Sequence, residues 1–274
     1  MGKEMIGELE LNRIYQRDCI EGMRMLPDNS IDLTVTSPPY DDLRKYNGFS
    51  FNFEEVAKEL YRVTKDGGVV VWVVGDKTEN GCESGTSFRQ ALFFKELGFN
   101  LHDTMIYEKD SISFPEKTRY YQIFEYMFVF SKGKPKSLNL IADRKNKWYN
   151  GRKQIKGHYR TDSGKARHNK QNLLKEYGVR FNIWRIPNGH QKSTLDKIAF
   201  EHPAIFPEKL AKDHILSWSK EGDCVLDPFM GSGTTAKMSL LHNRNYIGFE
   251  ISEDYVEIAE KRVNKYLKEA SHGE

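Results

Sequence analysis

Blocks of apolar and polar residues alternate along the chain and predict helices and strands in turn. Residues 53–63 carry apolar side chains three or four positions apart, which is the spacing of one helical face. Residues 69–74 read VVVWVV, a continuous apolar run that is typical of a strand buried on both faces. The sequence KDGG at residues 65–68 lies between these two blocks and predicts the end of the helix. The same alternation recurs toward the C-terminus, so we expect an α/β protein with a doubly wound, mostly parallel sheet.

The other blocks give the order of the remaining elements. Short apolar runs predict strands, and the wider helical spacing predicts helices. We expect strands at residues 12–17, 32–36, 101–108, 123–130, 224–226 and 246–250, and helices at residues 19–26, 87–97, 208–219, 233–242 and 253–267. The strands at 101–108 and 123–130 are predicted to be antiparallel neighbours at a sheet edge.

Residues 131–182 break this pattern and carry a strong positive charge. They contain 15 Lys and Arg residues against 3 Asp and Glu residues, a balance of +12. Because the whole chain has a net charge of +3, the rest of it carries −9. We interpret residues 131–182 as an insertion into one domain made of residues 1–130 and 183–274. A basic segment on an acidic body favours a polyanionic partner such as nucleic acid, although a solvated charged face explains the charge alone equally well.

Composition argues against several classes of protein. No apolar run has the length of a membrane span, and the charged N-terminus lacks the apolar region of a signal peptide. The three cysteines form no CxxC pair and the eight histidines form no His-x-x-x-His pair, so neither a disulfide framework nor a metal site is indicated. We therefore expect a cytoplasmic protein without a bound metal.

The first candidate for chemistry is the loop Ser37-Pro38-Pro39-Tyr40, which follows the expected strand at 32–36. Two prolines fix the backbone and remove two N–H donors, so they suit neither a central strand nor a helix interior. The sequence therefore predicts a stiff, extended loop that holds its carbonyl groups in place and presents an aromatic ring.

A second candidate is VLDPFMGSGTTA at residues 225–236, which predicts a strand, a glycine-rich turn and a helix. In doubly wound sheets such a turn binds nucleotide-like ligands, and an acidic residue about 20 positions later binds the ribose. Glu250 lies 23 positions after Asp227. The turn lacks the third glycine of GxGxxG, and the chain has no GxxxxGK[ST] loop, so S-adenosylmethionine fits better than NAD or ATP. The alternative is a turn whose glycines serve only close packing.

Taken together, the two loops resemble the motifs of the amino-group DNA methyltransferases. SPPY at 37–40 is similar to their catalytic motif, and DPFMGSGT at 227–234 is similar to their cofactor motif. Further resemblances are RDCIEGM at 17–23, HP at 202–203 with FPE at 206–208, and YIGFEIS at 246–252. The catalytic motif precedes the cofactor motif, which is the order of the β group, whose target-recognition region lies between the two. The resemblance covers nearly the whole chain outside residues 131–182.

The resemblance implies a fold, a cofactor and a set of cofactor-binding residues. The implied fold is a circularly permuted, seven-stranded methyltransferase sheet with an inserted basic recognition segment. The implied cofactor is S-adenosyl-L-methionine, with Asp18 near its adenine and Glu250 at its ribose. The full set expected to bind it is Asp18, Phe206, Asp227, Phe229, Gly231, Ser232, Gly233, Thr234 and Glu250.

The resemblance also gives the stiff loop a catalytic role. An exocyclic amino group on a base is a weak nucleophile because its lone pair is delocalised into the ring. The Ser37 hydroxyl and the Pro38 carbonyl are expected to accept its hydrogens and free the lone pair, while Pro39 keeps the loop rigid. Tyr40 is expected to stack on a base that has rotated out of the duplex.

Serine in the first position of this motif favours cytosine N4 as the methyl acceptor. Relatives with aspartate there mostly methylate adenine N6, and adenine N6 stays the alternative because the correlation is imperfect. Enzymes that act on RNA or protein amides more often carry asparagine there. A DNA-binding protein on a decayed methyltransferase scaffold is a further alternative, against which the intact Tyr40, Gly231, Gly233 and Glu250 speak.

The expected macromolecular partner is double-stranded DNA. Arg44, Lys45, Arg152 and Lys153 are the candidates for contacts with its phosphates. A homodimer and a cognate restriction enzyme are further partners that the resemblance allows, and the sequence decides neither. The target DNA sequence does not follow from residue spacing either.

Overall fold

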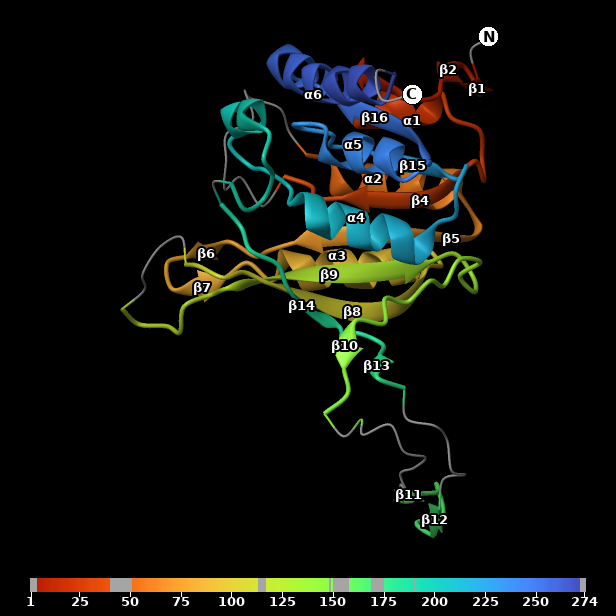
Figure 1. Ribbon diagram of the computed structural model, residues 1–274, viewed down its shortest axis with the longest axis vertical. Helices are drawn as coiled ribbons and strands as arrows, with labels where there is room; N and C mark the ends of the chain where they lie inside the picture. Colours follow the sequence, from red (N-terminus) through yellow and green to blue (C-terminus); the bar gives the residue numbers. More distant parts are fainter. Residues whose placement is uncertain are drawn as a thin grey trace. The chain divides into compact units, whose positions relative to one another are not determined.

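The computed structural model of the chain describes residues 4–39, 51–112, 117–147, 149, 158–168, 175–189 and 191–271. The chain divides into two units (Figure 1). The sheet unit consists of Met1–Asn139 and Asn182–Glu274, and the inserted unit consists of Leu140–Phe181.

The sheet unit is built on one eight-stranded sheet (Figure 1). Its strands lie in the order β14 (Ile183–Arg185), β8 (Asn100–Glu108), β9 (Phe124–Ser131), β5 (Thr64–Val74), β4 (Ile31–Thr36), β15 (Cys224–Asp227), β16 (Asn245–Glu250) and β3 (Arg13–Gln16). Strand β9 is antiparallel to both of its neighbours, and every other pair is parallel. The predicted α/β class and mostly parallel sheet are therefore confirmed. The sheet has eight strands rather than seven because the three-residue β14 pairs with the outer edge of β8.

Among the residues that the structure describes, six α-helices cover the two faces of this sheet. Helices α1 (Cys19–Arg24), α2 (Phe53–Val63) and α3 (Thr86–Glu96) bury apolar residues in one core. Helix α4 (Glu208–Trp218) packs on the opposite face with Met238 of α5 (Thr234–Leu241), and α5 and α6 (Glu253–Ser271) share a further core there. Helices on both faces make the sheet doubly wound, as predicted.

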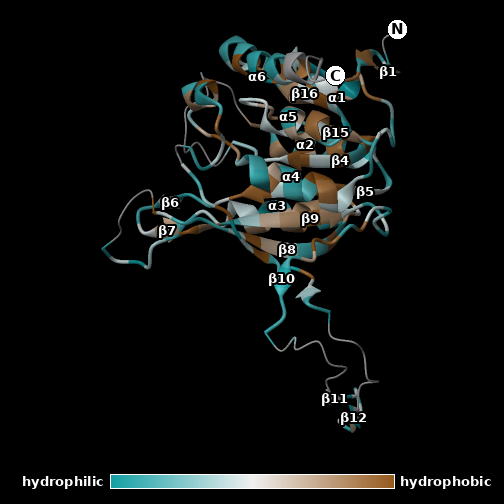
Figure 2. Ribbon diagram, viewed as in Figure 1, coloured by the Kyte–Doolittle hydropathy of each residue, from teal (hydrophilic) through white to brown (hydrophobic). Residues whose placement is uncertain are grey.

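Strand β5 shows how the apolar pattern sets this arrangement. Val70 and Trp72 are in the core under α2 and α3, whereas Val69 and Val71 are in the core under α4. Figure 2 shows the central strands of the sheet as mainly hydrophobic. The KDGG sequence does not separate helix from strand, since β5 begins at Thr64. Instead, the β4–β5 register shifts at this point, because Ile31 pairs with Thr64 and Leu33 pairs with Val69.

Short strands form the remaining elements. The sheet unit contains the pairs β1 (Met5–Ile6) with β2 (Leu9–Glu10) and β6 (Thr78–Glu79) with β7 (Cys82–Glu83), and the 3-10 helix η1 (Lys197–Glu201). The inserted unit contains β10 (Arg144–Lys145) paired with β13 (Tyr177–Gly178), and β11 (His158–Arg160) paired with β12 (Ala166–His168). None of the helices in the described part of the chain combines the length and apolarity needed to cross a bilayer.

Candidate active site

The stiff loop begins where β4 ends, at the carboxyl edge of the parallel strands. Thr36 is the last residue of β4, and Ser37, Pro38 and Pro39 follow it. Pro38 is buried and Ser37 is half-buried, so the packed sheet holds the start of the loop in place. Tyr40, the fourth residue of the motif, lies outside the described residues, and its stacking role stays a prediction.

A hydrogen bond across 191 positions joins this loop to the glycine-rich loop. The Thr36 hydroxyl donates to Oδ1 of Asp227 at 2.6 Å. A second bond runs from the Thr235 hydroxyl to the carbonyl of Val35 at 3.2 Å. Strands β4 and β15 are parallel neighbours, so the loops that follow them emerge side by side. The two motifs found separately in the sequence therefore lie next to each other at this edge of the sheet.

Asp227 is a buried carboxylate at this junction. It is only 4% exposed, and its Oδ1 also accepts the backbone N–H of Phe229 at 3.0 Å. Burial raises the pKa of the Asp227 carboxyl to about 6, although the Thr36 and Thr235 hydroxyls and the Phe229 N–H favour the charged form. Asp227 thus fixes the junction and carries a negative charge there at neutral pH.

The glycine-rich loop packs tightly through its two glycines. Gly231 has a φ of 49°, and a Cβ there would lie 3.1 Å from Nε2 of His202. Gly233 has a φ of 78°, and a Cβ there would lie 2.8 Å from Cβ of Ala259 in α6. Close packing is therefore one requirement for glycine at these positions, beside the predicted close approach of a ligand. Their contact with a cofactor stays a prediction.

Glu250 ends β16, the strand beside β15, and is held by backbone donors. Its Oε2 accepts the N–H of Gly231 at 2.8 Å, and its Oε1 accepts the N–H of Ser252 at 2.9 Å. Burial raises the pKa of the Glu250 carboxyl, and these backbone bonds oppose that rise. The carboxylate is therefore fixed beside the glycine-rich loop. Each carboxylate oxygen has a further lone pair for a ligand hydroxyl.

Asp18 follows the next strand along, β3, whose Gln16 pairs with Glu250. Oδ1 of Asp18 accepts the N–H groups of Ile20 and Glu21 at 2.9 and 3.2 Å, which makes it the N-cap of α1. Asp18 therefore has a structural role as a helix cap, and its contact with an adenine stays a prediction.

Other predicted cofactor residues face different surroundings. Phe229 packs edge-on against Phe51 at 5.4 Å between ring centroids, beside the core under α2 and α3. Phe206 packs against the core on the other face of the sheet. The side chains of Ser232 and Thr234 are buried and face the guanidinium of Arg262. A contact of either residue with a cofactor would therefore come from its backbone.

The four predicted phosphate-binding residues, Arg44, Lys45, Arg152 and Lys153, lie outside the described residues. In the inserted unit, Arg180 forms a two-pronged ion pair with Asp143, with N–O distances of 3.1 and 2.5 Å. The guanidinium of Arg144 lies 4.5 Å from the ring centroid of Phe181. These contacts fix side chains within the inserted unit, and its role in target recognition stays a prediction.

Sequence reasoning missed the residues that connect the two loops. Thr36 and Thr235 each stand next to a motif, but nothing in their local sequence indicates that they bond across the sheet. A buried group of charged residues around Arg262 was also missed, because charges on an amphipathic helix are usually solvated.

The sequence of this chain is similar to those of known DNA methyltransferases. Residues 31–261 match the model of the DNA methylase family N6_N4_Mtase. The orphan methyltransferase M.BamHII of Bacillus amyloliquefaciens is 80% identical over 241 residues, which cover 88% of this chain and 91% of that protein. The type II methyltransferase M.BglII of Bacillus subtilis is 29% identical over 257 residues, which cover 91% of this chain and 68% of that protein.

Solved structures share the fold. The PvuII DNA methyltransferase, described as cytosine-N4-specific, superposes with a TM-score of 0.65 at 22% identity and covers 95% of this chain and 93% of its own. The complex of M1.HpyAVI with SAM superposes with a TM-score of 0.61 at 23% identity and covers 92% of this chain and 98% of its own.

Proposed function

The chain belongs to the N6_N4_Mtase family of DNA methylases, and on this premise we propose that it methylates the exocyclic N4 of cytosine in duplex DNA. As a member of this family it is a site-specific DNA methyltransferase that uses S-adenosyl-L-methionine. The proposal adds the acceptor atom, rotation of the target base out of the duplex, and roles for individual residues.

The observation that carries the proposal is the Thr36–Asp227 hydrogen bond. It fixes the strand end that bears Ser37 and Pro38 directly against the strand end that begins the cofactor loop. A methyl transfer needs its donor and acceptor within contact distance, and this bond holds the two binding loops at one edge of the sheet.

The donor set fits S-adenosyl-L-methionine. Glu250 is fixed by two backbone N–H groups, and the remaining lone pairs of its carboxylate suit ribose hydroxyls. The N-terminus of α5 follows the loop directly and presents N–H groups suited to a carboxylate. When bound, the cofactor supplies an electrophilic methyl group on a sulfonium.

The residues of the stiff loop act on the acceptor amine. In the proposed pose, the Ser37 hydroxyl and the Pro38 carbonyl accept the two N4 hydrogens and direct the nitrogen lone pair away from the ring. A neutral hydroxyl is a weak base, so proton loss to water follows methylation, when the amine has become strongly acidic. Serine rather than aspartate at position 37 supports cytosine N4 as the acceptor.

The deciding experiment is mass spectrometry of nucleosides from duplex DNA treated with the purified enzyme and S-adenosyl-L-methionine. N4-methylcytosine is the expected product. N6-methyladenine would overturn the assignment of the base while leaving the family in place, and 5-methylcytosine would overturn the mechanism. Sequencing the same DNA would give the target site.

A further inference from the structure

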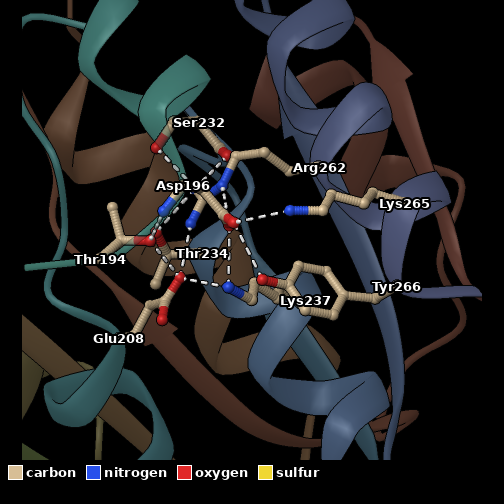
Figure 3. A network of polar contacts seen from close by, with 9 residues as sticks. All are labelled: Thr194, Asp196, Glu208, Ser232, Thr234, Lys237, Arg262, Lys265 and Tyr266. Atoms are coloured by element: carbon tan, nitrogen blue, oxygen red, sulfur yellow. Dashed lines mark hydrogen bonds and ion pairs between the residues drawn. The ribbon is translucent and has the colours of Figure 1, made fainter. Parts of the chain in front are cut away.

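Two buried cations lie beneath the glycine-rich loop, on the side where α6 packs (Figure 3). Arg262 of α6 and Lys237 of α5 are 1% and 3% exposed. They contact the carboxylates of Asp196, which is buried, and Glu208, which is 22% exposed, so each buried cation has an acidic partner. Charges are rarely buried to this degree unless each is paired, because an unpaired buried charge is strongly destabilising.

Arg262 connects this group directly to the glycine-rich loop. Its Nη1 donates to the carbonyl of Ser232 at 2.5 Å, to the Ser232 hydroxyl at 3.1 Å and to the Thr234 hydroxyl at 3.2 Å. Its Nη2 donates to Glu208 at 2.9 Å and its Nε donates to Asp196 at 3.2 Å. One planar guanidinium thus uses all three nitrogens, a geometry that a lysine ammonium cannot reproduce.

The same loop is held from its other end by Glu250, which accepts the Gly231 N–H. The turn at 231–234 is therefore held between a carboxylate at the predicted ribose position and a guanidinium beneath the loop. Any displacement of Ser232 moves Gly231, its neighbour, and so moves the donor that orients Glu250.

The same group of charged residues also contacts the segment that bears Phe206, another predicted cofactor residue. Glu208 is the first residue of α4 and lies two positions after Phe206, and its Oε1 accepts bonds from Thr194 and Lys237 at 2.5 Å each. Lys237 in turn contacts Asp196 at 2.8 Å. Arg262 therefore fixes the glycine-rich loop and the segment that bears Phe206 relative to each other.

We propose that Arg262 is a positioning residue. It holds the glycine-rich loop in the conformation that binds S-adenosyl-L-methionine before the cofactor arrives. This inference rests on the proposed cofactor site. A supporting residue that locks a binding loop raises affinity because the ligand need not order the loop itself. Loss of Arg262 should therefore weaken cofactor binding specifically, beyond any effect on stability.

The test compares Arg262→Met and Arg262→Lys with wild type by calorimetry, using S-adenosyl-L-methionine alone and, separately, duplex DNA alone. The matched control is Lys261→Met, since Lys261 is exposed on the same helix and forms an ion pair with Glu257 at the surface. We expect Arg262→Met to raise the cofactor Kd by about tenfold or more, Arg262→Lys to raise it less, and DNA affinity to stay within about twofold.

The possible results of this experiment distinguish the positioning role of Arg262 from the cofactor site itself. Folded Arg262 variants that bind the cofactor like wild type would overturn the inference, as would cofactor and DNA affinities that fall together. Arg262→Lys retains the buried charge, so it serves as the test if Arg262→Met does not fold. A wild-type protein that fails to bind the cofactor would instead overturn the cofactor site.

Discussion

Replacing Asp227 by asparagine should make the protein more stable at neutral pH while weakening its function. Burial raises the pKa of the Asp227 carboxyl from its ordinary value of 3.8 to about 6. The native state therefore binds a proton more tightly than the unfolded chain, so stability falls as the pH rises from about 4 to about 6. The difference between these two pKa values corresponds to a loss of about 3 kcal/mol in the free energy of unfolding once the pH is well above 6.

Asparagine keeps the geometry of the junction without the charge. Its side-chain oxygen can still accept from the Thr36 hydroxyl and the Phe229 N–H. The variant should therefore lack the loss of stability that wild type shows as the pH rises. Its stability relative to wild type should rise by about 2 kcal/mol between pH 4.5 and pH 7. Cofactor affinity should fall by about tenfold, because the carboxylate no longer attracts the positively charged ligand.

Urea unfolding at a series of pH values measures the first effect, and calorimetry with S-adenosyl-L-methionine at pH 8 measures the second. Asp66→Asn is the matched control, because it makes the same chemical change at an exposed carboxylate in β5. A stability difference between Asp227→Asn and wild type that stays flat with pH, or that shrinks as the pH rises, would refute the reasoning.

Three further variants, one of them a double substitution, test the remaining assignments. Ser37→Ala should lower kcat by about 10²–10³, the usual effect of losing one preorganised hydrogen bond in the transition state, and an unchanged kcat would remove Ser37 from the mechanism. Glu250→Ala should raise the cofactor Kd by about 10- to 100-fold through loss of the ribose acceptors, whereas Glu253→Ala, at the exposed start of α6, should bind like wild type. Neutralising Arg152 and Lys153 together should reduce the slope of log affinity for DNA against log salt by about 2, and an identical slope would mean that neither residue contacts phosphate.

The sequence by itself determined the elements and the places where they carry chemistry. The apolar run at 69–74 becomes the two-faced core of β5, and the helical spacing at 53–63 becomes α2 with the same bounds. Periodicity is a local property of the chain, so it can be read without knowledge of the fold. The stiff loop and the glycine-rich loop can also be recognised from the sequence, because each directly follows a strand. The carboxyl ends of parallel strands lie at one edge of a sheet, so both loops are expected there.

Only the tertiary structure decided which distant residues contact one another around the two loops. Thr36 and Asp227 are 191 positions apart, and the sequence contains no sign that one hydroxyl would satisfy that carboxylate. The spacing of α6 marks an amphipathic helix, yet Arg262 on it is buried beneath the glycine-rich loop. A charged side chain on a helix is solvated or buried according to what packs against it. That depends on where the helix docks, which is a property of the assembled sheet and not of the local sequence.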